Sequence, residues 1–467
     1  MMITFKLKSS KYGMLSISFF ITIIISIIFL FCFHPTNLTN DLYQCYYVLV
    51  FQLIIYLAVW IVLFLFTKID IFEPIVLVTA IHLLLFVITP IISLYQNDIL
   101  WFNKNVWGGC IKGTLLSTLA YVFFVFGYYF GKTKRRKYKQ KNIQNFGKIY
   151  SMSLIIWIFC FICNMVYILL AGINIKYFLT LGSSGSITIG ETSNSLVGFL
   201  SVISYGMISS YLYIFYYSNS KLLKGILFYL MFASFLIRGF RFIIVAMVVA
   251  PLFFVYLKEK KRPSVILVII LLLLLSISVG FIGGIRDSMR AGNGIGNSIN
   301  SIMQFEYITS VIIDNFSIYK TYYGIIQNIP AIMNYTFGKL MFMYTLIMFI
   351  PRFIWPSKPN PVSQKVNEIA VSKYASKAGT AYPYLGEYYH EFGIFGIMFF
   401  SFFFGKICSW LKIKMYERNI HSIILYSSIC PLLLQIMIRG YTPSNFYLII
   451  FSLLPIIILK KISVYEN

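Results

Sequence analysis

Apolar runs of about 20 residues, separated by short basic stretches, recur along most of this chain. A helix of about 20 apolar residues spans the hydrocarbon core of a bilayer. Because 59% of the 467 residues are hydrophobic and only 11% are charged, the chain has too few charged side chains for a soluble surface. The sequence therefore predicts an all-α polytopic integral membrane protein, with residues 1–467 forming a single membrane domain.

Apolar windows bounded by charged residues predict about 12 transmembrane helices. The predicted spans are residues 13–33, 43–66, 71–95, 107–131, 149–171, 196–217, 222–237, 240–257, 264–282, 391–411, 420–438 and 446–459. The first span follows Lys6, Lys8 and Lys11 and lacks a small-residue cleavage site. We therefore expect it to be an anchor rather than a removed signal peptide. The last span is short for a bilayer.

Basic residues dominate the charge, with 39 Lys and Arg against 14 Asp and Glu and a net charge of +25. They concentrate in alternate loops, for example in the run KTKRRKYKQK of loop 132–148 and in KEKKR at 258–262. Cytoplasmic loops of membrane proteins carry such an excess. The pattern predicts that both termini and the basic loop 132–148 are cytoplasmic, and that the smaller loop 172–195 is periplasmic. The charge thus indicates a lipid bilayer and a topology rather than nucleic acid.

The same topology places a large loop, residues 283–390, on the external face. Connections of this length without structure are uncommon and are usually functional. We therefore expect helices within it, at Ile299–Asn328 and in the apolar stretch Phe337–Phe349. The second stretch is too short for a comfortable span and is expected to be re-entrant or interfacial.

Six arginines gather near the predicted external face. They are Arg238, Arg241, Arg286, Arg290, Arg352 and Arg439. Arg238 and Arg241 lie near the centre of an apolar stretch, either on one helix face or at the outer tip of a tight hairpin. Burying a guanidinium group at membrane depth costs free energy, so such a group is usually paired or functional. Guanidinium groups also bind phosphoryl oxygens through two parallel hydrogen bonds. The cluster suits a diphosphate; the alternative is that the arginines reach the interface or pair with acidic residues.

Acidic and aromatic residues follow in YLGEYYHEFGIFG. Glu387, His390 and Glu391 come together on a helix, and a carboxylate or imidazole can act as a general base towards a sugar hydroxyl. The alternative is that the acids cap the start of their helix. Nearby aromatic residues, Tyr388 among them, can stack on sugar rings or form an interfacial belt. The sequence has no Gly-rich phosphate loop or paired zinc motif, so we expect no metal and no cofactor.

The segments IPRFIWPSKP and AYPYLGEYYHEFGIFGIMFF, with the embedded RGFR and about 12 spans, resemble the Wzy-type O-antigen and capsule polymerases. These are also called oligosaccharide repeat-unit polymerases. The resemblance implies a GT-C-like fold in the bacterial cytoplasmic (inner) membrane. It also implies transfer of a growing glycan from undecaprenyl diphosphate onto a new lipid-linked oligosaccharide repeat unit on the periplasmic side. A chain-length regulator and a flippase of the same pathway are the implied partners.

The resemblance marks five positions as family-like, and the sequence departs from the family in one respect. The five positions are Arg238, Arg241, Arg352, Lys358 and Glu387. No R-x10-G pattern begins at Arg286, Arg290 or Arg352. We expect Arg238, Arg241 and Arg352 to stabilise the leaving diphosphate, and Glu387 or His390 to be the base. Substrate binding is expected from Arg286, Arg290, Lys358, Tyr388 and Arg439. A lipid-oligosaccharide flippase, an O-antigen ligase and a non-catalytic scaffold are the alternatives.

Overall fold

The computed structural model describes most, but not all, of the chain. The described residues are 39–66, 69–98, 100–101, 104–130, 145–170, 195–238, 241–259, 316–348, 350, 354–358, 381–417 and 419–463. In this part of the chain nearly all residues are helical, as expected for an all-α membrane protein. The only strands there, β1 (Leu100–Trp101) and β2 (Lys104–Asn105), form a two-stranded antiparallel hairpin.

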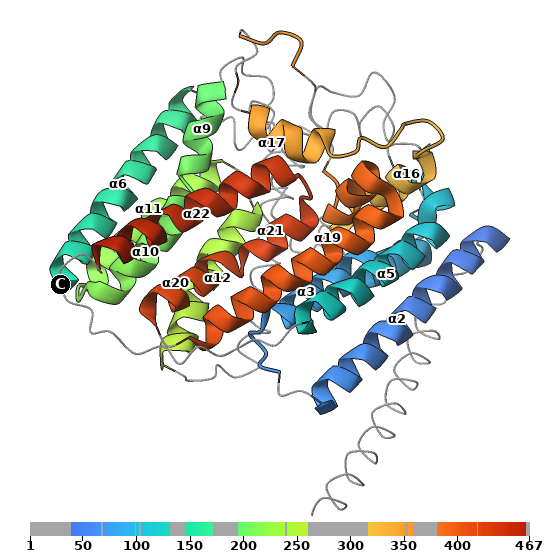
Figure 1. Cartoon of the computed structure of the whole chain (residues 1–467), viewed down its shortest axis with the longest axis horizontal. Helices are drawn as coiled ribbons and strands as arrows, with labels where there is room; N and C mark the ends of the chain where they lie inside the picture. Colours follow the sequence, from blue (N-terminus) through green and yellow to red (C-terminus); the bar gives the residue numbers. More distant parts are fainter. Residues whose placement is uncertain are drawn as a thin grey trace, which may run out of the picture.

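The long apolar helices form one bundle (Figure 1). They are α2 (Asn40–Phe66), α3 (Pro74–Leu83) continued by η1 (Leu84–Ile88) and α4 (Thr89–Tyr95), η2 (Trp107–Gly109) continued by α5 (Cys110–Tyr129), α6 (Phe146–Leu170), α9 (Ser195–Ile203) followed by α10 (Gly206–Tyr217), α11 (Lys221–Ile237), α12 (Arg241–Glu259), α19 (Tyr384–Tyr416), α20 (Ile420–Ile429) followed by α21 (Leu432–Ile438), and α22 (Thr442–Ile462). Shorter helices are α16 (Tyr319–Asn328), η4 (Lys339–Met343) and α17 (Tyr344–Ile347).

Within the described residues, 9 helical segments are long and apolar enough to cross a membrane, and each overlaps a predicted span. A tenth prediction, 222–237, coincides with α11, which has 17 residues. The predicted spans 13–33 and 264–282 lie outside the described residues, so the total of 12 stays a prediction. The last helix has 21 residues, and the short span expected at 446–459 was therefore wrong in its bounds.

Lysine-rich helix ends gather at one end of the bundle, which we call the basic end. There Lys412 of α19 forms an ion pair of 2.8 Å with Glu73, which precedes α3. Lys258 of α12 lies 4.5 Å from the ring centroid of Tyr216 near the end of α10. The end of α22 and the start of α6 lie near the same end in Figure 1, whereas α16 and α17 lie at the opposite end. Tyr256 of α12 also donates to Asp70, so the ends of α12 and α19 and the segment before α3 lie at the same end of the bundle.

Helices α5 and α19 approach each other so closely that glycine is required at the contact. A Cβ added at Gly405 would overlap the carbonyl oxygen of Phe124, and one added at Gly127 would overlap that of Phe402. Small residues allow such close approach between membrane helices, where dispersion replaces the hydrophobic effect as the main attraction. These contacts therefore hold the second part of α19, around Gly405, closely against α5.

A buried hydrogen-bond network connects α2, α3 and α5 to the first residue of α19. The two ring nitrogens of His82 are hydrogen-bonded to the hydroxyls of Tyr56 (3.0 Å) and Tyr384 (2.6 Å). Gln52 donates to Tyr56 and to Ser117 at 2.9 and 2.7 Å. Buried polar groups cost free energy unless they are paired, so this network fixes the start of α19 in one position.

Helix α19 is broken at Phe392 and Gly393, and a segment of the large loop fills the break. Gly393 has φ 61°, which favours glycine. The backbone N–H groups of Thr336 and Phe337 donate to the carbonyls of His390 and Glu391 at 3.2 and 2.9 Å. Carbonyls that the break leaves without helical partners are thereby satisfied. Helix α19 also begins at Tyr384 rather than at residue 391, so Glu387 and His390 lie within the helix.

We expect Gly405→Ala to destabilise the protein by about 1–3 kcal/mol, because backbone atoms of α5 cannot move aside for a methyl group. Gly147→Ala on α6 is the matched control, since nothing lies within 4 Å of a Cβ added there. Alanine is the better helix former, so this control should keep or raise stability. The measurement is the thermal unfolding midpoint of the purified protein in detergent. Size-exclusion chromatography of the heated samples reports unfolding. Equal midpoints for the two variants would contradict the proposed contact.

Candidate functional site: a polar corner at the start of α19 and α22

The turn between α21 and α22 lies directly against the first residues of α19. Gly440 donates its backbone N–H to the carbonyl of Tyr382 at 2.9 Å. A Cβ added at Gly440 would overlap the backbone of Tyr384 and Pro383, so only glycine fits here. This contact brings Arg439 beside the sequence YLGEYYHE. We call Lys358, Glu387, Arg439 and Thr442, with the backbone that carries them, the polar corner.

Glu387 holds the N-terminus of α22. Its two carboxylate oxygens each accept from the backbone N–H of Thr442 at 3.0 Å, and one also accepts from the Thr442 hydroxyl at 2.6 Å. The side chain is 1% exposed. A carboxylate at this position satisfies an N–H that the helix leaves without a partner, and it complements the helix dipole. Glu387 therefore caps a helix, but this helix is α22 rather than α19, in which Glu387 itself lies.

His390 and Glu391 are fully buried on the same part of α19. Glu391 accepts from the backbone N–H of Gly338 at 2.6 Å, which fixes the loop segment in the α19 break. Tyr388 is buried as well, and its ring lies 5.4 Å from that of Tyr384 and 5.1 Å from that of Phe400. The side chains of these three residues are thus surrounded by protein atoms in this conformation. A substrate would reach them only if neighbouring segments moved.

Lys358 reaches the same corner from the large loop. Its ammonium group donates to the carbonyls of Met348 (2.7 Å) and Ile350 (3.1 Å) and lies 5.3 Å from the ring centroid of Tyr344. The Tyr344 ring in turn lies 6.2 Å from that of Tyr441, next to the Gly440 turn. The exposed Arg439 side chain belongs to this turn. Lys358, Glu387 and Arg439 thus lie on three segments, far apart in the sequence, that are linked by the Tyr344–Tyr441 ring contact and the Glu387–Thr442 hydrogen bonds.

Arg238 lies at the break between α11 and α12, which agrees with the hairpin alternative. Its guanidinium group donates to Asn164 (2.7 Å) and to the hydroxyls of Ser201 and Ser204 (both 2.6 Å). The rings of Tyr167, Tyr205 and Phe235 face it, with centroids at 4.8, 5.6 and 5.0 Å. Uncharged acceptors and aromatic faces thus hold a cation that is 3% exposed.

The Arg238 site and the polar corner are built by different helices. Arg238 is held by α6, α9 and α11, whereas Glu387 is held by α19 and α22. Asn164 precedes the end of α6 by six residues, which places the guanidinium about 9 Å inside that end. No local sequence pattern joins these acceptors to Arg238. Asn164 within an apolar run was the available signal.

Four of the predicted arginines have no described side chain. Arg241 begins α12, but its side chain lies outside the described part, and Arg286, Arg290 and Arg352 lie outside it altogether. Their predicted roles stay predictions. Within the described ranges, no group of three or more His, Cys, Asp and Glu side chains could hold a metal ion.

The sequence of the chain matches a family model over nearly its whole length. The model is that of the O-antigen polysaccharide polymerase Wzy family, and it matches residues 14–467. The chain belongs to this family. No curated protein and no solved structure matches it. Membership in the Wzy family makes the chain a multi-pass membrane protein and a polymerase of O-antigen repeat units, in agreement with the resemblance found in the sequence.

We expect Glu387→Ala in this Wzy-family protein to lower the free energy of unfolding by about 1–3 kcal/mol, because the Thr442 N–H loses its acceptor. Glu387→Gln retains one acceptor oxygen and should lose less. The measurement is the thermal unfolding midpoint in detergent, as for the glycine variants. If the alanine and glutamine variants unfold at the wild-type temperature, Glu387 does not hold α22.

Proposed function

We propose that the protein polymerises undecaprenyl-diphosphate-linked oligosaccharide repeat units of a surface polysaccharide, O-antigen or capsule. In this reaction a hydroxyl of the incoming unit attacks the anomeric carbon of the growing glycan. The bond between that carbon and the diphosphate oxygen breaks, undecaprenyl diphosphate leaves, and the hydroxyl proton passes to a base. The family match over residues 14–467 is the observation that carries this proposal.

The proposed orientation puts the polar corner on the outer face of the cytoplasmic membrane. Lys258 and Lys412 lie at the basic end, and such residues favour the cytoplasmic side. The polar corner lies at the opposite end, where lipid-linked units would be available after their transfer across the membrane. Cytoplasmic termini, a GT-C-like fold and 12 spans belong to this same proposal.

The proposed chemistry needs cations on the leaving diphosphate. Arginine stays protonated and binds phosphoryl oxygens through charge-assisted hydrogen bonds. We assign Arg238, Arg241 and Arg352 to the leaving diphosphate, and Arg286 and Arg290 to its approach. Lys358 and Arg439 would bind the substrate at the polar corner. The exposure of Arg439 and its place beside the start of α19 support this assignment.

The base is assigned to Glu387 or His390. Both are buried, so the acceptor hydroxyl would reach them only after the loop segments at the corner move. The hydrogen bonds between Glu387 and Thr442 support a second role, in which Glu387 positions the turn that carries Arg439. Glu387→Gln separates the two roles, because it retains the acceptor and removes the base. A folded variant without polymer supports the base, whereas a full-length polymer supports positioning alone.

Deleting the gene in its native strain should reduce the surface glycan from a ladder to a single repeat, because no unit is added to another. The measurement is gel electrophoresis of the extracted glycan together with the location of the lipid-linked units. Single units that accumulate on the outer face support the polymerase. Units trapped on the cytoplasmic side would indicate a flippase, and intact polymer left unattached would indicate a ligase.

Arg439→Gln should lower the polymerisation rate roughly 10-fold to 100-fold, the effect of losing a hydrogen bond between charged groups. Arg439→Lys keeps the charge and should retain part of the activity. Lys221→Gln, at the exposed start of α11 near the basic end, is the control and should polymerise as the wild type does. The readout is ladder length after complementation of the deletion strain. A wild-type ladder with Arg439→Gln would remove Arg439 from the substrate site.

A further inference from the structure

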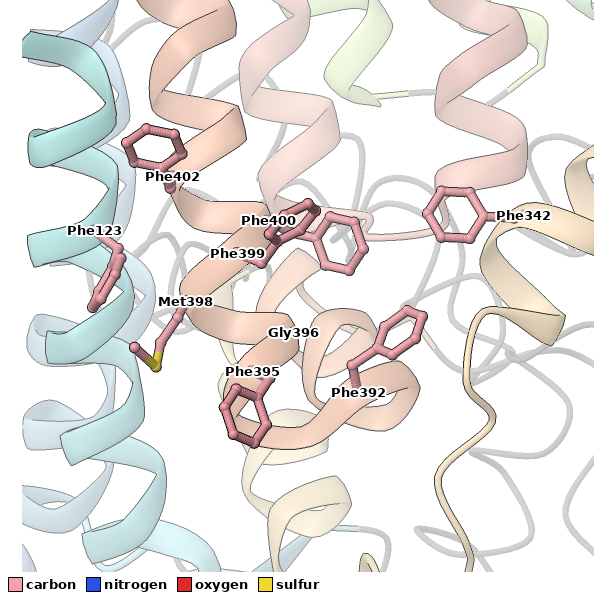
Figure 2. A pocket seen from close by; sticks show the side chains of 9 residues that line it. All are labelled: Phe123, Phe342, Phe392, Phe395, Gly396, Met398, Phe399, Phe400 and Phe402. Atoms are coloured by element: carbon pink, nitrogen blue, oxygen red, sulfur yellow. The ribbon is translucent and has the colours of Figure 1, made fainter. Parts of the chain in front are cut away.

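A pocket lined by phenylalanine opens between α5, the second part of α19 and η4. It encloses about 540 Å³. Figure 2 shows the side chains of α19, including Phe395, Phe399 and Phe402, spread between Phe123 of α5 and Phe342 of η4. Pockets that bind small molecules enclose about 300–1,000 Å³. The volume is therefore sufficient for part of a ligand, and the lining is suited to hydrocarbon.

The pocket owes its shape to the break in α19. Phe392 and Gly393 do not have helical backbone angles. The ring of Phe392 lies 5.8 Å from the ring of Phe400, which follows the break in the same helix. Phe342 reaches Phe400 from η4 at 6.0 Å. Phe395 and Phe399 remain 81% and 57% exposed, so their open side faces the surroundings of the bundle. In a membrane those surroundings are lipid chains.

Two lysines lie at the α16–α17 end of this pocket. Lys112 precedes Phe123 by eleven residues on α5, about three helical turns, so the two lie on one face and about 16 Å apart along the axis. Lys339 begins η4, one turn before Phe342. Both lysines are exposed, and among the described residues neither ammonium group forms an ion pair.

A chain of aromatic contacts leads from Lys112 to the pocket. The ammonium group lies 5.2 Å from the ring centroid of Tyr389. Tyr389 contacts Tyr335 (ring centroids 5.9 Å apart), Tyr335 contacts Phe337 (6.2 Å), and Phe337 contacts Phe392 (6.3 Å). A single ligand with an anionic head and a long apolar chain would meet cations first and phenylalanine rings next.

We propose that this pocket binds the isoprenoid chain of a polyprenyl diphosphate lipid, with its diphosphate at Lys112 and Lys339. The proposal rests on the polymerase function proposed above and adds the location of the lipid carrier of the incoming unit, because the leaving diphosphate of the growing glycan is assigned to Arg238, Arg241 and Arg352. Two ammonium groups at one end of the pocket suit an anionic head, and aromatic faces suit methyl-branched alkene units. The site lies beside the loop segment that fills the α19 break, and this segment is hydrogen-bonded to Glu391. The bound lipid would thus adjoin the helix that bears Glu387.

Photo-crosslinking of the full-length protein in nanodiscs tests the proposal. Benzoylphenylalanine replaces Phe399 in one variant and Phe51 of α2 in the control, since these side chains are 57% and 60% exposed. The probe is radiolabelled undecaprenyl diphosphate without sugars. We expect roughly 10-fold more labelled protein with the crosslinker at residue 399. Unlabelled undecaprenyl diphosphate should compete, and phosphatidylglycerol in the same amount should not. Equal labelling at both positions, or equal competition by phosphatidylglycerol, would overturn the proposal.

Lysine variants test the head-group site separately. Lys112→Gln and Lys339→Gln should each lower labelling at residue 399 roughly 10-fold, as expected for the loss of one charged contact. Lys221→Gln is the control and should label as the parent does. Unchanged labelling in both lysine variants would remove the diphosphate from this position. Because labelling needs no polymerisation, a missing crosslink in a strain that still makes its ladder refutes this site and leaves the polymerase function intact.

Discussion

The apolar environment of the bundle requires each internal charge or polar group to find its partner within the protein. Water is absent from the membrane core, so an unpaired group there costs several kcal/mol. Arg238 meets this requirement with Asn164, Ser201 and Ser204, and Glu387 meets it with Thr442. These pairings decide which helices lie next to one another. They also decide where the chemically active side chains are held.

The polar corner shows how the same pairings connect fold and function. The ring of His82 fixes Tyr384 from inside the bundle, and Gly440 allows the next turn to lie on the Tyr384 backbone. Glu387 then holds Thr442, which begins α22. This series of contacts places the turn that carries Arg439. Rigid supporting contacts of this kind are what a site for phosphoryl groups requires, because small displacements weaken charged hydrogen bonds.

Helix positions followed from the sequence, whereas helix partners did not. Apolar runs such as that of α6 predict a span from hydropathy alone. For Arg238 the sequence left a helix face and a hairpin tip open, and the structure puts it at the end of α11, before α12. The hydrogen bond between His82 and Tyr384 joins residues 302 positions apart, and no local pattern specifies it. Where Glu387 was expected to cap a helix, it was expected to cap its own, but it caps α22 instead; its role as a base stays a prediction. Which carboxylate reaches which helix end depends on the register of packed helices, and this register is set by contacts such as those of Gly405 and Gly440.

The break in α19 places the apolar pocket and the polar corner on two parts of one helix. The first part, which contains Glu387, is held by α22 and by the His82 network. The second part, which contains Phe399, packs on α5 through Gly405. The loop segment before η4 is hydrogen-bonded to His390 and Glu391, just before the break, and Phe342 of η4 contacts Phe400 beyond it. A lipid that displaced Phe342 would therefore act on the segment that covers Glu391. At the proposed site, a carrier chain in the pocket would therefore lie against the same loop segment that is hydrogen-bonded to Glu391.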